Sequence, residues 1–371
     1  MKKVNGHEVI QLFEHFSPKS YAMEGDKIGL QIGRLNKQVD NVMVALDVLE
    51  DVVDEAIEKN VQLIIAHHPI IFRPLQKITT DTAYGRIIEK LIKHDIAVYA
   101  AHTNLDVAKG GVNDLLAEAL GLSDTEVLVP TYETKLKKLV VFVPNEDAEK
   151  VKEALGNVGA GSIGNYSHCL FSGSGIGQFL PGEDTNPHIG TIGKIEEVHE
   201  TRIETIFPAQ LEKKIVSAMI KSHPYEEVAY DIYPLDNKGE TLGLGRIGTI
   251  DQMTLKDFAL HVKEALGVHG LRVVGDLDSK VKKVAVLGGD GNKYFMSAKF
   301  KGADVYVTGD MYYHVAHDAI LEGLNIIDPG HNVEKVMKKG VSNILTKMFA
   351  EKGYDVKIFP SEKETDPFQF L

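Results

Sequence analysis

The sequence contains no tryptophan and only one cysteine among its 371 residues. A single cysteine, Cys169, cannot form a disulfide within the chain, and it excludes a zinc or iron–sulfur site built from several cysteines. Any metal site must therefore rely mainly on His, Asp and Glu, and we expect a reducing, cytoplasmic location. No apolar run approaches the ~20 residues of a membrane helix. The mixed polar and apolar N-terminus shows no secretory signal.

An excess of positive charge is also lacking, because 41 Lys and Arg face 53 Asp and Glu and the net charge is −12 at pH 7. Such an acidic chain is a poor non-specific binder of nucleic acid, and no basic run with interleaved aromatic residues appears. The length suffices for two or three domains, and 43% of the residues are hydrophobic. We expect an ordinary globular protein that binds neither membranes nor nucleic acid.

Both ends of the chain alternate short apolar strand patterns with helical patterns. Such alternation predicts parallel βαβ units with helices on the faces of a sheet. We therefore expect an α/β fold whose core has two similar halves, 1–126 and 242–371. The expected strands are 42–46, 63–66 and 96–101 in the first half, and 284–287, 304–307, 325–327 and 354–359 in the second. The expected core helices are 49–58, 84–93, 112–120 and a long helix from Val333 onward.

The residues between these halves have a different pattern. Strand-like edges surround two expected helices, 147–155 and 209–222. The stretch 156–190 between the helices is rich in Gly, Ser and Pro, which predicts long hairpins or a mobile loop. We expect residues 130–240 to form an inserted α+β domain with the ferredoxin-like order β-α-β-β-α-β.

Two adjacent histidines, His67 and His68, stand where the expected strand 63–66 ends. In open parallel sheets, ligands bind beyond the carboxyl ends of the strands. The pair alone has a structural explanation, in which one imidazole caps the strand and the other faces solvent. Neighbouring residues on a strand point to opposite faces, so two histidines share a locus only at a strand end, or when they hold two different metals.

Two further segments follow strand ends in the same way. His102 and Asp106 come after the third strand of the first half, and His331 and Glu334 come after the third strand of the second half. Turn formation alone would explain the first segment, and a favourable acidic residue at a helix start would explain Glu334 in the second. That explanation does not account for His331, and three such segments at strand ends together favour a metal site.

The candidate ligands supply only nitrogen and oxygen donors, which suit Zn²⁺, Mn²⁺ or Fe²⁺. A mononuclear catalytic zinc typically has three protein ligands. With five candidates, we expect two divalent metal ions per chain that share Asp106 or Glu334. His102 is the candidate catalytic residue, as a general acid/base, with a further ligand or a partner of a ligand as open alternatives. The five candidate ligands are His67, His68, Asp106, His331 and Glu334.

Other polar segments carry weaker signals. Gly288 to Lys293, GGDGNK, resembles a phosphate-binding loop at a helix start but lacks the spacing of a P-loop. A tight strand-to-helix turn explains its glycines equally well. His314 and His317 lie on an expected helix, where surface or interface positions are more common.

Five segments, in their order along the chain, resemble the Nif-three-like dinuclear-metal family. Many members of that family carry the name GTP cyclohydrolase I type 2 homologue. The resemblance covers both core halves, and HPYEEVAYDIYPL (223–235) resembles the PII/CutA-like insertion of the longer bacterial members. The five segments are GDKIGLQIG (25–33), IIAHHPIIF (64–72), AAHTNLD (100–106), TGDMYYH (308–314) and GHNVEK (330–335).

The resemblance assigns the family's metal ligands to the same five residues. It also implies a toroidal homohexamer whose metal pairs face an internal cavity. As a function it implies metal-dependent hydrolysis of a nucleotide such as GTP, opened at the imidazole ring with loss of formate. The alternative is a non-enzymatic metal-binding regulator or metal-insertion protein whose insert senses a ligand. Purely structural metals are disfavoured, because structural sites are usually closed.

Overall fold

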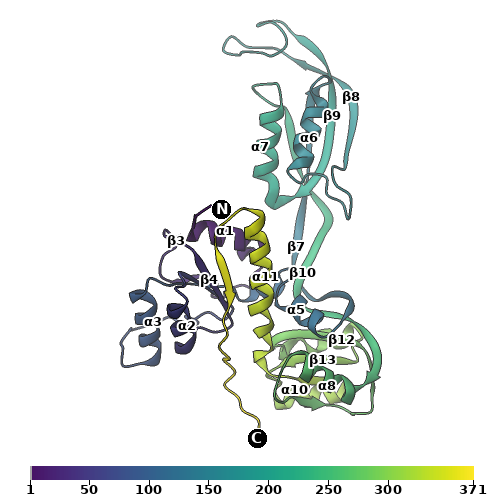
Figure 1. Ribbon diagram of the computed structural model, residues 1–371. Helices are drawn as coiled ribbons and strands as arrows, with labels where there is room; N and C mark the ends of the chain where they lie inside the picture. The colour runs from purple at the N-terminus through teal and green to yellow at the C-terminus, as the bar shows by residue number, and fades with distance from the viewer. Residues whose placement is uncertain (1) are drawn as a thin grey trace. The chain divides into compact units, whose positions relative to one another are not determined.

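The computed structural model describes residues 2–371 (Figure 1). The chain divides into two compact units: unit 1 runs up to Tyr132 and resumes at Leu242, and unit 2 is Glu133–Thr241. Over residues 2–371 there are three sheets and 11 α-helices. The predicted mixed α/β class is therefore confirmed.

The first sheet of unit 1 has the strand order β15-β4-β5-β6-β2. Its first four strands are parallel, and β2 is antiparallel to β6. All residues of β5 and β6 are buried, as expected for a parallel sheet with both faces covered. The strands are β15 (Lys357–Pro360), β4 (Asn41–Ala45), β5 (Leu63–Ala66), β6 (Ala97–Ala100) and β2 (Gly29–Ile32).

Strand β15 differs from the expectation, which assigned the end of the chain to the second half. It pairs in parallel with β4 of the first half, with Ile358 opposite Val42. The long helix α11 (Val336–Glu351) leads the chain back to that edge. An apolar pattern predicts that a segment is a strand, but it does not say which free sheet edge the strand will join.

A second sheet contains the strands of the other half. In unit 1 its order is β11-β14-β13-β12-β10-β7. Strands β12, β13 and β14 are parallel, whereas β10 runs antiparallel to β12. The strands are β11 (Arg272–Val274), β14 (Asn325–Asp328), β13 (Val305–Gly309), β12 (Lys280–Asp290), β10 (Tyr230–Thr254) and β7 (Ser123–Pro144). The long strands β7 and β10 both continue into unit 2.

The helices of unit 1 pack on both sheets. Along β4, Val42 and Val44 belong to one apolar cluster and Met43 and Ala45 to another, because alternate side chains face opposite sides. The first cluster also contains residues of β12, β13 and β14, so the two halves share a core. The remaining helices are α1 (Gly6–Phe16), α2 (Glu50–Glu58), α3 (Ala83–Lys93), α4 (Thr103–Val107), α5 (Val112–Ala119), α8 (Leu255–Ala265), α9 (Phe295–Phe300) and α10 (Tyr313–Leu321). The short strands β1 (Val4–Asn5) and β3 (Gln38–Val39) pair with each other.

Unit 2 has its own strands, helices and core. Its elements follow in the order β7, α6 (Ala148–Asn157), β8 (Leu170–Phe179), β9 (Glu196–Pro208), α7 (Glu212–Ser222), β10, and its strands lie in the order β10-β7-β9-β8. Helices α6 and α7 lie side by side (Figure 1) and pack on one face of the sheet. Strand β8 falls within the Gly/Ser/Pro-rich stretch and pairs antiparallel with β9, as the hairpin expectation required.

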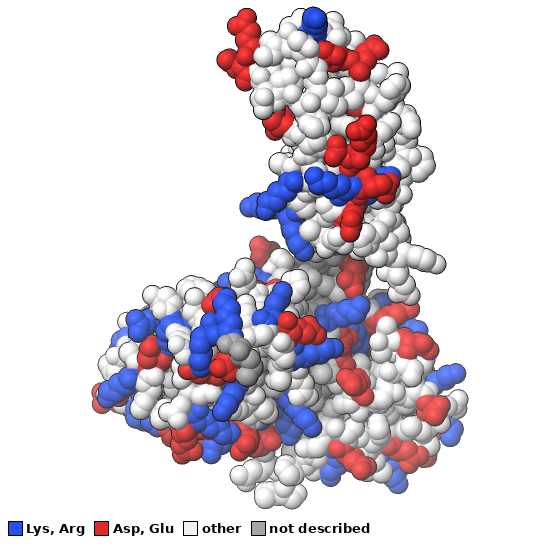
Figure 2. Space-filling model, turned by 45° about the horizontal axis from the view of Figure 1, so that its top comes forward, with Lys and Arg blue, Asp and Glu red and all other residues white. Residues whose placement is uncertain are grey.

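Charged side chains of both signs are interspersed over the face of unit 1 that Figure 2 shows, without a continuous basic stripe on that face. Such mixing is typical of a solvated surface. Among residues 2–371, no helix combines the length and the apolar character needed to span a bilayer.

Asn113 of α5 connects the two sheets of unit 1 through its buried amide. Its Nδ2 donates to the carbonyl of Asp106 at 3.0 Å. Its Oδ1 accepts from the backbone N–H of Gly288 in β12, also at 3.0 Å. The side chain is 1% exposed, so water cannot replace either bond. The amide thus joins the segment after β6 to the end of β12.

We predict that Asn113→Ala destabilises the protein by about 2 to 4 kcal/mol, because it leaves two buried backbone groups without partners. Denaturant unfolding followed by circular dichroism measures this change. The control is Asn157→Ala, at an exposed position of α6, which should change stability by less than about 0.5 kcal/mol. Equal effects of the two substitutions would show that the amide bridge contributes nothing.

Candidate metal centre

All six predicted site residues lie together beyond the carboxyl ends of three strands. His67 and His68 directly follow β5, and His102 follows β6 and precedes α4, which contains Asp106. His331 and Glu334 lie in a short 3₁₀ helix, His331–Lys335, that follows β14. The cluster therefore takes residues from both halves of unit 1.

Glu334 is the centre of the cluster. Its Oε2 lies 3.1 Å from Nε2 of His68, 3.2 Å from Nε2 of His331 and 3.6 Å from Nε2 of His67. Oδ1 of Asp106 lies 3.7 Å from the same Nε2 of His67. Glu334 is 3% exposed and Asp106 9% exposed. One carboxylate oxygen thus faces three imidazoles, and a second carboxylate shares one of them.

The glycines of the GGDGNK segment leave room for this carboxylate. A Cβ on Gly289 would lie 2.8 Å from Oε1 of Glu334, and one on Gly288 would lie 3.0 Å from it. Gly289 also has φ +63°, a conformation that favours glycine. The two glycines are therefore explained by close packing against Glu334, which neither a phosphate loop nor a tight turn alone would require.

The four imidazoles share one arrangement. In each, Nδ1 lies within hydrogen-bond distance of an oxygen outside the cluster. If Nδ1 carries the proton of a neutral ring, Nε2 keeps a free lone pair that can bind a metal. This is the usual arrangement of metal-binding histidines. The partners are Ala101 O for His67 (2.9 Å), Asp47 Oδ1 for His68 (2.7 Å), Asp26 Oδ1 for His102 (2.8 Å) and Asp310 Oδ2 for His331 (2.8 Å).

These orienting carboxylates were missed as functional residues by the sequence analysis. Asp47 and Asp310 each stand just beyond a strand, β4 and β13, so the rule that located the histidines would have found them. The position of Asp26 gave no such signal, because it precedes β2. Asp47 is itself held by Thr365 from the last residues of the chain, whose hydroxyl donates to Oδ2 at 2.6 Å.

The charges of the cluster depend on one another. Burial disfavours a charged His68, but its hydrogen bonds to Asp47 and Glu334 prevail and raise its pKa to about 10. The hydrogen bond to Glu334 raises the pKa of His331 to about 9. Burial raises the pKa of the Asp106 carboxyl to about 6. Burial would also raise the pKa of Glu334, but the charge of His67 and the hydrogen bond from His331 hold it well below its usual range.

The cluster is suited to a metal ion. His67 Nε2 and Asp106 Oδ1 are buried and have no hydrogen-bond partner among the described residues, which is costly for polar atoms that lack water. Three groups of side chains bring their ligand atoms within 4.8 Å of one another and could hold a cation. They are His67/Asp106/Glu334, His68/His331/Glu334 and His67/His68/His102. The first two groups share only Glu334.

The fold and the site thus define a mixed α/β protein with a buried histidine and carboxylate cluster that could bind metal. Residues 4–367 match the family described as Duf34/NIF3 (NGG1p interacting factor 3), and the chain belongs to this family. A Bacillus subtilis protein named "GTP cyclohydrolase 1 type 2 homolog" is 66% identical over all of both chains. A Staphylococcus aureus protein of the same name is 39% identical over 98% of this chain and 99% of its own.

Solved structures agree with this assignment. A Bacillus cereus protein related to NIF3 has a TM-score of 0.96 and 65% identity, with both chains fully covered. A Staphylococcus aureus protein has a TM-score of 0.78 and 34% identity, again with full coverage of both chains. The resemblance drawn from the five motifs is therefore confirmed at the level of the family.

We predict that metal binding releases protons near pH 7. Without metal, His68 and His331 are protonated there because their pKa values lie near 10 and 9, and a metal binds only neutral imidazole. Apparent Zn²⁺ affinity should therefore rise from about pH 6 to about pH 9. Titration calorimetry in buffers of different ionisation enthalpy measures the release, and proton uptake, or none, would contradict the assignment.

We predict that Asp47→Asn lowers metal affinity by about 10- to 100-fold without unfolding the protein, because a neutral amide replaces the charged carboxylate that orients His68. Thr365→Val, which removes only the hydroxyl that holds Asp47, should have the same sign and a smaller size. Competition with a chromophoric chelator measures both affinities. Asp81→Asn, at an exposed loop position, is the matched control and should leave the affinity unchanged.

Proposed function

We propose that this protein binds two divalent metal ions per chain and uses them in hydrolysis. The observation that supports a pair is that His67/Asp106/Glu334 and His68/His331/Glu334 are separate groups with one common member. A carboxylate that two cations share is usual in dinuclear sites. Of the two bridging candidates in the sequence, the geometry favours Glu334 over Asp106.

Zinc is the first expectation for the metal, with manganese or iron as alternatives, because the ligands are imidazoles and carboxylates without thiolate. When bound, such a pair would supply a Lewis acid that polarises a substrate oxygen and makes water a better nucleophile. The protein's own contribution is to hold the imidazoles in orientation and to keep Glu334 ionised.

We propose that His102 acts as a general acid/base. Asp26 fixes its Nδ1, so a neutral ring with its proton on Nδ1 presents the lone pair of Nε2 for a proton transfer. Asp26 is held in turn by the backbone N–H and the hydroxyl of Thr103. Burial would raise the pKa of Asp26, but its hydrogen bonds with His102 and Thr103 hold it well below its usual range, so it remains an acceptor.

A nucleotide is the proposed substrate class, and GTP is the compound to test first. Support comes from the name of the relatives, "GTP cyclohydrolase 1 type 2 homolog". In the corresponding reaction, water opens the imidazole ring of the purine and its C8 carbon leaves as formate.

We also propose that unit 2 is a ferredoxin-like domain related to PII and CutA, inserted in the core, and that the protein assembles as a hexamer. The element order β-α-β-β-α-β of unit 2 and the strand order β10-β7-β9-β8 support the ferredoxin-like fold of unit 2.

Light scattering after size exclusion tests the proposed hexamer. A mass of six chains is the expected result, and the mass of a monomer would contradict the proposal.

Turnover by the metal-loaded protein tests the proposed enzyme. Formate release from GTP should require metal, and His102→Gln should reduce its rate by about 100-fold or more while metal content stays unchanged. If His102→Gln instead loses metal, the residue is a ligand. His314→Gln, on exposed α10, is the control. Tight metal binding without turnover of any nucleotide would favour the non-enzymatic regulator.

A further inference from the structure

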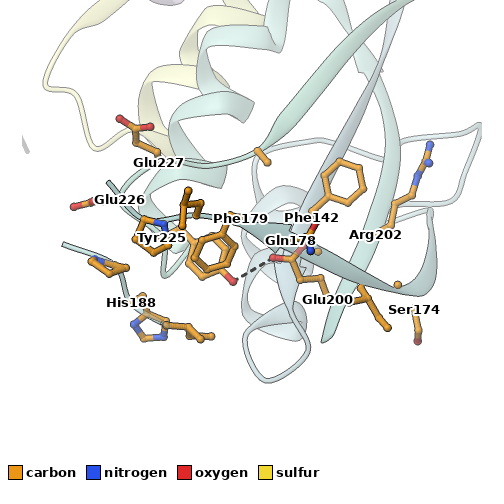
Figure 3. A pocket seen from close by; sticks show the side chains of 18 of the residues that line it. Phe142, Ser174, Gln178, Phe179, His188, Glu200, Arg202, Tyr225, Glu226 and Glu227 are labelled. Carbon is orange, nitrogen blue, oxygen red and sulfur yellow. Dashed lines mark hydrogen bonds between the residues drawn. The ribbon is translucent and has the colours of Figure 1, made fainter. Parts of the chain in front are cut away.

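Unit 2 contains a cavity of about 630 Å³ that is separate from the cluster of histidines (Figure 3). Its floor is one face of strands β8 and β9 with Phe142 of β7, and its walls come from residues 180–189 and 225–229. Its volume is within the range of small-molecule sites. Helices α6 and α7 pack against the opposite face of the sheet, through Val141 and Ile203 among others.

The cavity exists because strand β8 has glycine at alternate positions. Gly173, Gly175 and Gly177 share the face of the sheet that lines the cavity. A Cβ on Gly173 or Gly175 would meet nothing within 4 Å, so no packing contact requires glycine at these two positions. Glycine inside a strand weakens it and often marks a place where a ligand comes close.

A buried carboxylate, Glu200 of β9, lies in the floor. It is 7% exposed, and its Oε1 accepts a hydrogen bond from the hydroxyl of Tyr225 at 3.2 Å (Figure 3). Its Oε2 receives no hydrogen bond from the residues that the structure describes. A Cβ on Gly177 would lie 2.3 Å from Oε2, so this glycine accommodates the carboxylate. A ligand in the cavity that carries N–H groups could therefore donate to this carboxylate, whose Oε2 has no protein partner.

Aromatic rings surround this carboxylate. Phe179 and Tyr225 meet edge to face at 6.0 Å between ring centres, and Phe142 and Phe171 add to the lining. Phe171 is 72% exposed, although a ring of this size gains free energy when it is covered. The walls therefore suit a flat, apolar ring.

The charges around the cavity disfavour an anionic ligand. Four carboxylates line it against a single guanidinium, that of Arg202, which already donates from Nε to Glu204 Oε1 at 2.9 Å. The other three carboxylates are Glu200, Glu226 and Glu227. Glu226 also accepts from the backbone N–H of Asn186 at 2.8 Å, which holds the 180–189 wall in place.

We infer that this cavity binds a planar ring with two adjacent N–H donors, an amidine-like edge that pairs with the carboxylate of Glu200. Guanine has such an edge, and so do aromatic amidines. The ring would lie among the aromatic side chains, over the glycines of β8. This inference does not depend on the metal centre, because every residue that carries it belongs to unit 2.

Calorimetric titration of the full-length protein with benzamidine and with benzoate tests the inference. The two probes have the same size and shape but opposite charge. Benzamidine should bind one site per chain, and benzoate should bind at least about tenfold more weakly. Guanosine and inosine then test whether guanine supplies the two adjacent N–H donors. Inosine lacks the amino group of guanosine, so guanosine should bind more tightly.

Two variants locate the binding. Glu200→Gln should weaken benzamidine binding by about tenfold or more, and Gly175→Leu, which fills the cavity, should abolish binding of every probe. Glu149→Gln removes the same charge from an exposed site on α6 and should change nothing. Metal content should be that of the wild type in all three, which separates this test from the proposed enzyme.

Three results of the binding experiments would overturn the inference: no binding of benzamidine or guanosine to the wild type, equal binding of benzamidine and benzoate, or binding that Gly175→Leu leaves intact. A loss of oligomeric mass on Gly175→Leu would also overturn it. That result would assign this sheet face to contact with a second copy of the chain.

Discussion

The arrangement of unit 1 depends on one buried carboxylate. Oε2 of Glu334 faces the Nε2 atoms of His67, His68 and His331 at 3.1 to 3.6 Å. An ionised carboxylate without partners in this position would be strongly destabilising, so it requires the first half of the core, which supplies His67 and His68. The apolar core that both halves share holds the ends of β5 and β14 close enough for this contact. The packing of the two halves against each other thus forms both the shared apolar core and the cluster around Glu334.

Acceptors outside the cluster then determine what its members can do. Oxygen atoms within hydrogen-bond distance of Nδ1 orient each ring so that its Nε2 faces the cluster. Without a metal, the hydrogen bonds of His68 with Asp47 and Glu334 raise the pKa of His68, and the hydrogen bond with Glu334 raises that of His331. A metal ion would therefore have to compete with protons for the same nitrogen atoms, and the surrounding carboxylates would stabilise positive charge of either kind. Within the cluster, the hydrogen bonds of the protein leave two buried atoms without a partner, His67 Nε2 and Asp106 Oδ1.

Much of this arrangement was predictable from sequence because parallel strands bring their carboxyl ends to one edge. Strand 63–66 has the predicted bounds, and the six candidate side chains meet as that rule expects. The pairing of β15 with β4 was not predictable, because apolar patterns do not identify a partner strand. The contact of Thr365 with Asp47 joins residues 318 positions apart, which no local pattern shows. The glycines of β8 left a hairpin and a mobile loop both open, and the structure shows the hairpin, in which β8 pairs antiparallel with β9.

Elemental analysis of the purified, tag-free protein is the most direct test of the central claim, that the two halves of unit 1 hold two metals through a shared Glu334. After incubation with Zn²⁺ or Mn²⁺ and removal of the excess, we expect close to two metal ions per chain. Glu334→Gln should lose both ions, whereas Asp106→Asn should lose mainly one. A wild-type content of one or none, or a Glu334→Gln variant that retains both ions, would contradict the account.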